Sequence, residues 1–193
     1  LFMHVPGLRL VMPSTAYDAK GLLAASIADG NPVMFIEHRW LFNHKSHVLE
    51  ELYAIPLGKG LIRRKGKDVT IVGISYMAIE ALRAAEELEK EGYSAEVIDP
   101  RTLKPLDEEI ILESVKKTGH LVIADTDWKT CGAASEIASM VAQEGFKYLK
   151  SAINKISQNS LKSRIISTIV YKNYLNRKIL VMITIHKAVM III

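Results

Sequence analysis

Apolar residues recur along the first 156 positions in two spacings, each typical of one kind of secondary structure. Short, nearly continuous apolar runs indicate strands buried on both faces, and apolar residues roughly three or four positions apart indicate helices. Strands are expected at residues 8–12, 33–37, 68–75, 121–125 and 152–156, with another that ends near Asp99. Helices are expected at residues 16–28, 76–91, 108–117 and 133–143. Because strands and helices alternate, the pattern predicts an α/β fold built on a parallel sheet.

Residues that begin and end helices stand at the borders of these segments. Thr15 followed by Asp18 fits a capping box, and Asp107 is a suitable cap for the helix at 108–117. Gly92 and Gly119 follow two of the helices, where a residue that accepts a left-handed backbone is common. The borders therefore agree with the apolar pattern.

The helix at 76–91 has a distinct apolar side. We expect Ile79, Leu82, Ala85 and Leu88 to face the core, and Glu86 to pair with Lys90 one turn further on.

The chain divides into four segments. They are a βαβ unit at residues 1–42, a connector at 43–67 with a strand-like run at 52–57, an open α/β domain at 68–157, and an aberrant tail at 158–193. A lone βαβ unit cannot bury both faces of its sheet. We therefore expect residues 1–42 to be the remnant of a larger domain in a truncated chain.

Charge and composition change abruptly near residue 150. All 21 acidic residues, all 11 glycines and all 6 prolines precede position 146, whereas residues 151–193 hold 7 Lys/Arg and none of those types. Residues 1–150 carry 18 Lys/Arg against 21 Asp/Glu, so the net charge of +4 comes from the tail. Nucleic-acid binding is not expected, because the first 150 residues show no basic helix or aromatic-studded strand. The basic run at 63–67 is expected to be a solvated turn.

Membrane insertion and disulfide bonding are not expected either. The apolar runs at 179–185 and 188–193 are separated by His186 and Lys187, and each is shorter than the roughly 18 residues of a membrane span. The single Cys131 rules out a disulfide framework within one chain and fits a reducing compartment. We therefore expect a cytoplasmic protein.

Several residues invite a catalytic or metal-binding interpretation. The first helix ends at residues 29–31, where carbonyl groups without partners attract cations, although the residues alone favour an ordinary capped turn. Ser75 lies between a strand and a helix, but the second glycine of a nucleophile elbow is missing, so we expect an N-cap. Nothing in the sequence places His120 beside Ser75 to complete a triad with Asp99 or Asp125. The same turn lacks Gly-x-Gly-x-x-Gly, so dinucleotide binding is weakly indicated.

The remaining histidines and the cysteine do not have the spacing of a zinc site. His38, His44 and His47 share one loop far from Cys131, and we expect them to be exposed. Trp128 is expected to pack against the edge of the sheet.

Short blocks in a constant order carry a resemblance to a known family. They include residues 4–8 (HVPGL), 12–22 (MPSTAYDAKGL), 30–33 (GNPV), 55–59 (IPLGK), 101–107 (RTLKPLD) and 125–129 (DTDWK). The chain resembles the β subunit of the E1 component of 2-oxo acid dehydrogenase complexes and, more widely, the C-terminal domain of the transketolase superfamily. The resemblance covers residues 4 to about 150 and fails beyond 157.

The resemblance implies an open parallel-sheet, transketolase C-terminal-like domain preceded by a βαβ remnant of a pyrimidine-binding domain. It implies a parent enzyme that oxidatively decarboxylates pyruvate or a related 2-oxo acid with thiamine diphosphate. That parent would be a heterotetramer of two E1 α and two β subunits on an E2 acyltransferase core. Its catalytic and cofactor-binding residues would lie upstream of His4, so none is expected here. The family's potassium ion would be held, largely through backbone oxygens, by Ser26, Ile27, Asp29 and Asn31.

Three other functions stay open. A transketolase-like protein acting on a sugar or another 2-oxo substrate would belong to a sugar-pathway gene cluster. A non-catalytic assembly module would contribute dimer contacts and a docking surface for E2. A hydrolase would use Ser75 and act on an activated ester.

We predict that residues from about 158 onward are the product of a shifted reading frame, because Asp, Glu, Gly and Pro disappear where the resemblance ends. Residues 179–193 contain β-branched, weakly charged windows that favour aggregation, so truncation near Ser157 should raise solubility. Translation of the other two frames across codons 150 to 193 tests the prediction. A proline-rich segment followed by an acidic amphipathic helix is expected in one of them, and its absence from both contradicts the prediction.

Overall fold

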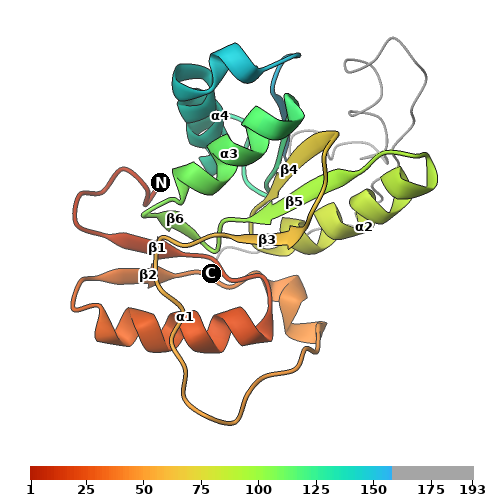
Figure 1. Ribbon diagram of the computed structural model, residues 1–193. Helices are drawn as coiled ribbons and strands as arrows, with labels where there is room; N and C mark the ends of the chain where they lie inside the picture. The colour runs from red at the N-terminus through yellow and green to blue at the C-terminus, as the bar shows by residue number, and fades with distance from the viewer. Residues whose placement is uncertain (158–193) are drawn as a thin grey trace.

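The computed structural model describes residues 1–157, which form two sheets with helices packed on them (Figure 1). The predicted aberrant tail, 158–193, lies outside the described residues. In chain order the elements are β1 (Arg9–Val11), α1 (Ala16–Ala28), β2 (Val33–Phe35), the 3-10 helix η1 (Arg39–Asn43), β3 (Leu61–Arg64), β4 (Val69–Gly73), α2 (Tyr76–Lys90), β5 (Ala95–Asp99), β6 (Thr102–Lys104), α3 (Glu108–Thr118), β7 (Leu121–Ala124), α4 (Ala133–Glu144), the 3-10 helix η2 (Phe146–Tyr148) and β8 (Asn154–Ile156).

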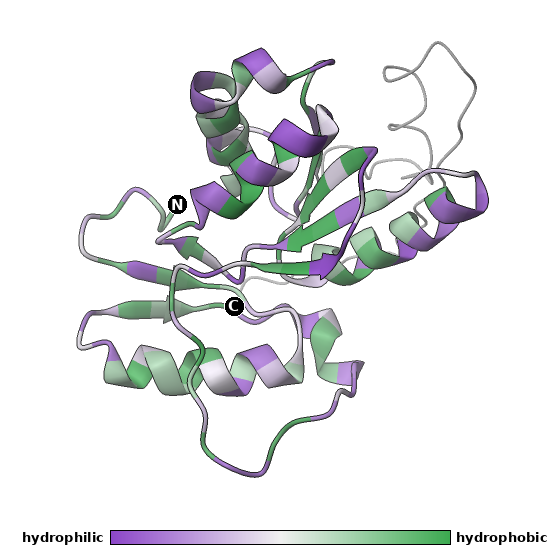
Figure 2. Cartoon of the chain, in the orientation of Figure 1, coloured by the Kyte–Doolittle hydropathy of each residue, from purple (hydrophilic) through white to green (hydrophobic). Residues whose placement is uncertain are grey.

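The larger sheet has the strand order β3-β5-β4-β7-β8. Strands β4, β5, β7 and β8 are parallel, and β3 is antiparallel to β5 at the edge. Helix α2 packs on one face, while α3 and α4 cover the other (Figure 1). With both faces covered, every residue of β4, β5 and β7 is buried, and these strands are predominantly apolar (Figure 2). This confirms the predicted mostly parallel α/β sheet.

The smaller sheet has the order β2-β1-β6. Strand β1 is parallel to β2 and antiparallel to β6, which comes from much later in the chain. Helix α1 packs against this sheet through a small cluster of Val11, Leu22 and Ile55. The sheet therefore joins the N-terminal β1-α1-β2 unit to the rest of the fold.

The predicted helix borders agree with the structure. Thr15 caps α1, because its side-chain oxygen accepts a hydrogen bond from the Asp18 N–H at 3.1 Å. Asp107 caps α3 in the same way through the Ile110 N–H. Gly119, which follows α3, has a φ of 78°, a left-handed conformation that its lack of a Cβ makes easy.

Several local expectations were wrong. Residues 52–57 form no strand, because Ile55 bonds through its N–H to the Gly21 carbonyl and packs on α1. Strand β6, within the block at residues 101–107, is a strand that the apolar pattern does not predict. On α2, Lys90 pairs with Glu87 instead of Glu86.

Two aromatic positions also differ from expectation. Trp128 is 54% exposed instead of packed on the sheet edge. His38 is half-buried because its ring stacks on Tyr76, with ring centroids 5.1 Å apart. Among residues 1–157, no helix has both the length and the apolar character to cross a lipid bilayer.

Glu96 provides a pH-dependent contribution to stability. Its buried carboxylate pairs with Lys117 and accepts a hydrogen bond from the Gly66 N–H at 3.3 Å. Burial favours the neutral acid, but Lys117, Ser114 and the Gly66 N–H together lower the pKa of Glu96 below its ordinary value of 4.5. A lowered carboxylate pKa contributes stability above the unfolded-state pKa, and that contribution is lost as pH falls through the folded-state value.

We therefore expect Lys117→Met to lower the free energy of unfolding by about 1 kcal/mol at pH 7, a magnitude limited by the partial exposure of the lysine. The difference from wild type should shrink once the pH falls below the ordinary glutamate range. Thermal unfolding measured at neutral and acidic pH checks this. Lys116→Met is the matched control, since Lys116 pairs with the exposed Glu113. An equal loss of stability at both pH values would contradict the explanation.

Candidate functional site

Polar residues follow the carboxyl ends of four strands. Ser14 follows β1, Ser75 follows β4, Asp99 ends β5 and Asp125 follows β7, and each is at most 5% exposed. Open α/β sheets bind ligands outside the carboxyl ends of their parallel strands. A site is therefore expected at the carboxyl edge of the larger sheet, which Ser14 of the smaller sheet's connection reaches through its bond to Asp99.

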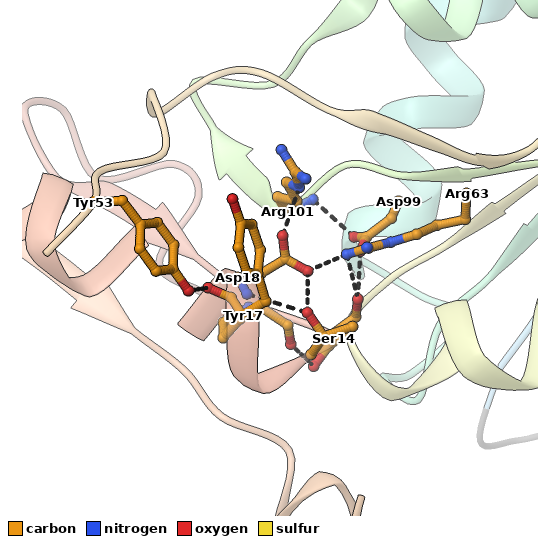
Figure 3. A network of polar contacts seen from close by, with 10 residues as sticks. Ser14, Tyr17, Asp18, Tyr53, Arg63, Asp99 and Arg101 are labelled. Atoms are coloured by element: carbon orange, nitrogen blue, oxygen red, sulfur yellow. Dashed lines mark hydrogen bonds and ion pairs between the residues drawn. The ribbon is translucent and has the colours of Figure 1, made fainter. Parts of the chain in front are cut away.

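Asp99 is the centre of a buried polar network (Figure 3). Its Oδ2 accepts hydrogen bonds from the Ser14 hydroxyl and from Arg63, whose Nη2 lies at 2.7 Å and Nε at 3.1 Å. Its Oδ1 accepts from the backbone N–H of Arg101 at 3.0 Å. Both oxygens of a fully buried carboxylate are thus satisfied.

Asp18 is the second carboxylate of the network. It lies in the first turn of α1 and is also fully buried. Its Oδ2 accepts hydrogen bonds from Arg63 Nη2 and from the Thr15 hydroxyl, and its Oδ1 lies 3.0 Å from Arg101 Nε. Asp18 and Asp99, from different parts of the chain, therefore share Arg63 (Figure 3).

Irregular backbone places both arginines. The register of β3 against β5 shifts between Ile62 and Arg64, so Arg63 is the extra residue of a β-bulge, which re-aims its side chain. Arg101 has a φ of 60°, in the left-handed region that non-glycine residues adopt with strain. Its N–H is held by the Asp99 side chain two residues earlier, an Asx-type turn.

Burial and charge pairing act in opposite directions on the network. Burial raises the pKa of Asp99, an effect that Arg63 and the Ser14 hydroxyl oppose. Burial works against the charged form of Arg63, but Asp99 and Asp18 hold the pKa of this guanidinium above its ordinary value. With two carboxylates facing two guanidinium groups, the cluster is neutral overall.

This arrangement corrects the prediction of a solvated turn at residues 63–67 for its first two residues, which belong to β3, whereas Lys65 and Lys67 are exposed as expected. The Arg63 side chain is 16% exposed and bonded to both carboxylates. The basic run conceals the strand, and the apolar pair Leu61 and Ile62 before it is the signal of an edge strand. Ser14 and Asp18 stand on either side of the N-cap of the first helix, and nothing in the sequence links them to Asp99.

Ser75 occupies the predicted N-cap position of α2, but its side chain does not act as a cap. It makes no capping hydrogen bond, and its hydroxyl donates to the Pro13 carbonyl at 3.0 Å. Its φ of 53° is strained for a residue with a side chain. His120 lies elsewhere, with Nδ1 2.9 Å from the Ser151 hydroxyl. The structure does not bring Ser75 and His120 together as a triad.

The turn between β4 and α2 does not fit a diphosphate group. Phosphate sites at helix N-termini need open backbone N–H groups. Here the Met77 N–H donates to the Ile74 carbonyl at 3.0 Å and the Ala78 N–H to the Ser75 carbonyl at 2.9 Å. Pro13 covers the Ser75 hydroxyl. The described residues therefore offer no place for thiamine diphosphate at this turn.

Asp125 stabilises the loop that leads to α4. Burial raises the pKa of its carboxyl group, while backbone N–H groups of Asp127, Ala134 and Thr126 oppose the shift. The Asp127 N–H lies 3.1 Å from Asp125 Oδ1. These bonds indicate a capping role for Asp125.

The residues named for a potassium ion surround the end of α1. Ser26 and Ile27 lie in the last turn, where carbonyl groups have no intrahelical partner. Asn31 donates through its side-chain amide to the Asp29 carboxylate at 2.7 Å and to the Asp29 carbonyl at 3.3 Å, and Arg9 lies 3.2 Å from the same carboxylate. Asn31 and Arg9 lower the pKa of Asp29, although partial desolvation opposes them. The set fits a cation best through the carbonyl oxygens of Ser26 and Ile27.

Histidines and the cysteine do not gather around a metal in residues 1–157. Among these residues, no group of three or more His, Cys, Asp or Glu side chains is placed to hold an ion. His44, His47 and Cys131 are exposed.

Comparison with known proteins places the chain in a family. A model described as the transketolase C-terminal domain matches residues 58–178, and one described as the transketolase pyrimidine-binding domain matches residues 1–45. The chain belongs to the transketolase family. The resemblance found in the sequence is therefore confirmed. The first match runs to residue 178, so the expectation that the resemblance fails beyond residue 157 was wrong.

Curated relatives in this family are β subunits of two kinds of enzyme. The chain is 49% identical over 156 residues to the acetoin:2,6-dichlorophenolindophenol oxidoreductase subunit beta of Cupriavidus necator, covering 81% of this chain and 46% of the relative. Identity to the Bacillus subtilis subunit of the same name is 46% over 157 residues, with the same coverage. Identity to the pyruvate dehydrogenase E1 component subunit beta of Rickettsia felis is 46% over 156 residues, covering 81% and 48%.

A solved structure supports the same fold. A chain described as a split gene transketolase, inactive beta4 tetramer, superposes with a TM-score of 0.66 at 26% identity, covering 81% of this chain and 50% of that one. The chain spans about half the length of the curated relatives it matches. It corresponds to the transketolase C-terminal domain with part of the pyrimidine-binding domain.

Proposed function

We propose that this chain forms part of the β subunit of a thiamine diphosphate-dependent E1-type oxidoreductase acting on pyruvate, acetoin or a related small 2-oxo or acyloin compound. The observation that supports this most strongly is the 46 to 49% identity to such β subunits over at least 156 residues. That identity crosses both family-matched regions. The acetoin subunits make acetoin a candidate beside the pyruvate expected from the sequence.

The chain's contribution would be structural within a larger catalytic assembly. We propose an E1 α subunit and a second β subunit as partners, an E2 acyltransferase core as the acceptor of the product, and a cytoplasmic location. Thiamine diphosphate would supply the carbanion chemistry from contacts outside this chain. One observation supports that assignment: the β4-α2 turn does not fit a diphosphate, because its N–H groups and the Ser75 hydroxyl already bond within the chain.

A chimaeric subunit tests the function. Residues 1–157 replace the matching half of the Bacillus subtilis acetoin subunit, which is produced with its own α subunit. We expect acetoin- or pyruvate-dependent reduction of 2,6-dichlorophenolindophenol, because the transplanted half supplies the same fold. Calorimetric titration should show thiamine diphosphate binding to the chimaeric assembly and none to the present chain alone.

The controls separate failure of assembly from failure of function. The unaltered Bacillus subtilis pair gives the reference rate, and size-exclusion chromatography shows whether the chimaera assembles. An assembled chimaera without activity on either substrate would contradict the proposal. Micromolar cofactor binding by the present chain alone would overturn the assignment of cofactor contacts to other regions.

Potassium should stabilise that assembly through the end of α1. A ligand that binds only the folded state raises stability by mass action. We expect the chimaera to melt at a higher temperature in potassium chloride than in a salt of a bulky organic cation at equal ionic strength. The ligands would include oxygens of Ser26, Ile27, Asp29 and Asn31. An unchanged melting temperature would show that this turn is an ordinary helix end.

A non-catalytic assembly module is the second candidate. The superposed relative is described as an inactive beta4 tetramer, so a β-type chain of this fold assembles without activity. A sugar substrate has weaker support, since the relatives at 46% identity or more act, by name, on acetoin or pyruvate.

A further inference from the structure

The β1-α1-β2 unit has a small core of its own. Its cluster holds three buried residues, Val11, Leu22 and Ile55, whereas the two clusters flanking the larger sheet each hold several times as many. Two apolar side chains of α1 are solvent-exposed, Leu23 at 48% and Ile27 at 78%. Strand β1 also places Leu10 in the large cluster on the α3 and α4 side, with Met34 and Ile36 packed beside it, so the weak apolar attachment is that of α1. Regions with few buried apolar contacts open at lower free energy than the global unfolding.

Polar contacts also join this unit to the rest of the fold. The network of Ser14, Asp18, Arg63, Asp99 and Arg101 links the start of α1 to β3 and β5 (Figure 3). Further contacts are the pairing of β6 with β1, the hydrogen bond of the Ser75 hydroxyl to Pro13, that of the Met12 N–H to the Arg101 carbonyl, and those of Lys104 to the carbonyls of Met3 and Val5. Arg63 is the one side chain of the network bonded to both buried carboxylates.

Charge balance makes Arg63 critical. Removing it leaves Asp18 and Asp99 buried near one another with a single guanidinium, that of Arg101. An uncompensated buried charge is far more costly than the absence of the whole pair. The structure can relieve it by moving Asp18, together with α1, away from Asp99.

We propose that the Arg63 network is a charge-balanced latch that holds α1 on the larger sheet, and that the β1-α1-β2 unit opens on its own when the balance is broken. The latch concerns the docking of two parts of one chain and is independent of the enzymatic role proposed above.

Hydrogen exchange of the full-length chain tests the latch, with mass spectrometry resolving individual segments. Arg63→Met should accelerate amide exchange in α1 by about 100-fold, the scale set by breaking a buried ion pair. Exchange in α2, α3 and β7 should stay within a few-fold of wild type. Arg64→Met is the matched control: the same substitution one residue further on removes a pair with the exposed Glu89 and should leave α1 protected.

A second change distinguishes a latch from ordinary packing. In the double variant Arg63→Met with Asp99→Asn, the charges of Asp18 and Arg101 again balance each other. Amide exchange in α1 should therefore return most of the way to the wild-type rate. If the single variant does not fold but the double variant does, that recovery of folding equally shows that restored charge balance holds α1 in place. If neither variant folds, Arg63→Lys is the test, because lysine keeps the charge but loses the planar fork. Amide exchange in this variant should then be faster in α1 and unchanged in α2, α3 and β7.

Three results would overturn the proposal. One is equal acceleration in α1 and α2, which indicates a general loss of stability. Another is protection of α1 unchanged by Arg63→Met. The third is a double variant whose α1 exchanges as fast as in the single variant.

Discussion

The guanidinium of Arg63, held between two fully buried carboxylates, is the interaction on which the arrangement of the molecule depends. A buried ion pair contributes little net stability compared with apolar packing, because both ions lose their hydration. What such a pair contributes is specificity, since a misdocked arrangement leaves a charge without a partner. Here it defines a single relative position for the start of α1 and the carboxyl end of β5.

The regular parts of the fold were readable from the sequence because one physical signal dominated each of them. Strands β4 and β7 are buried on both faces and appear as nearly continuous apolar runs. Thr15, Asp107 and Gly119 act within a few residues of where they stand, through hydrogen bonds that any short segment can form. Because these interactions join residues close together in the chain, a short stretch of sequence is enough to predict them.

The candidate site could not be predicted from the sequence, because its residues are far apart along the chain. Arg63 and Asp99 are 36 positions apart, and Asp18 is 45 positions from Arg63. A bulge re-aims Arg63, and the four residues of β3 are too few to show an extra residue as a break in period-two alternation. Ser75 has the residue type of an N-cap, but the contact with Pro13, 62 positions away, decides its role. Long-range polar partners are settled by tertiary structure, and a single sequence does not specify them.

Strand β6 shows that the structural division of this chain differs from the division by family match. The two family matches meet between residues 45 and 58, yet the sheet β2-β1-β6 takes its third strand from residues 102–104. A strand from the region that matches the C-terminal domain thus completes the sheet of the region that matches the pyrimidine-binding domain, as in strand complementation between separate chains. A cut at the family boundary would leave β1 with an open edge, so the evolutionary border and the structural border of this protein do not coincide.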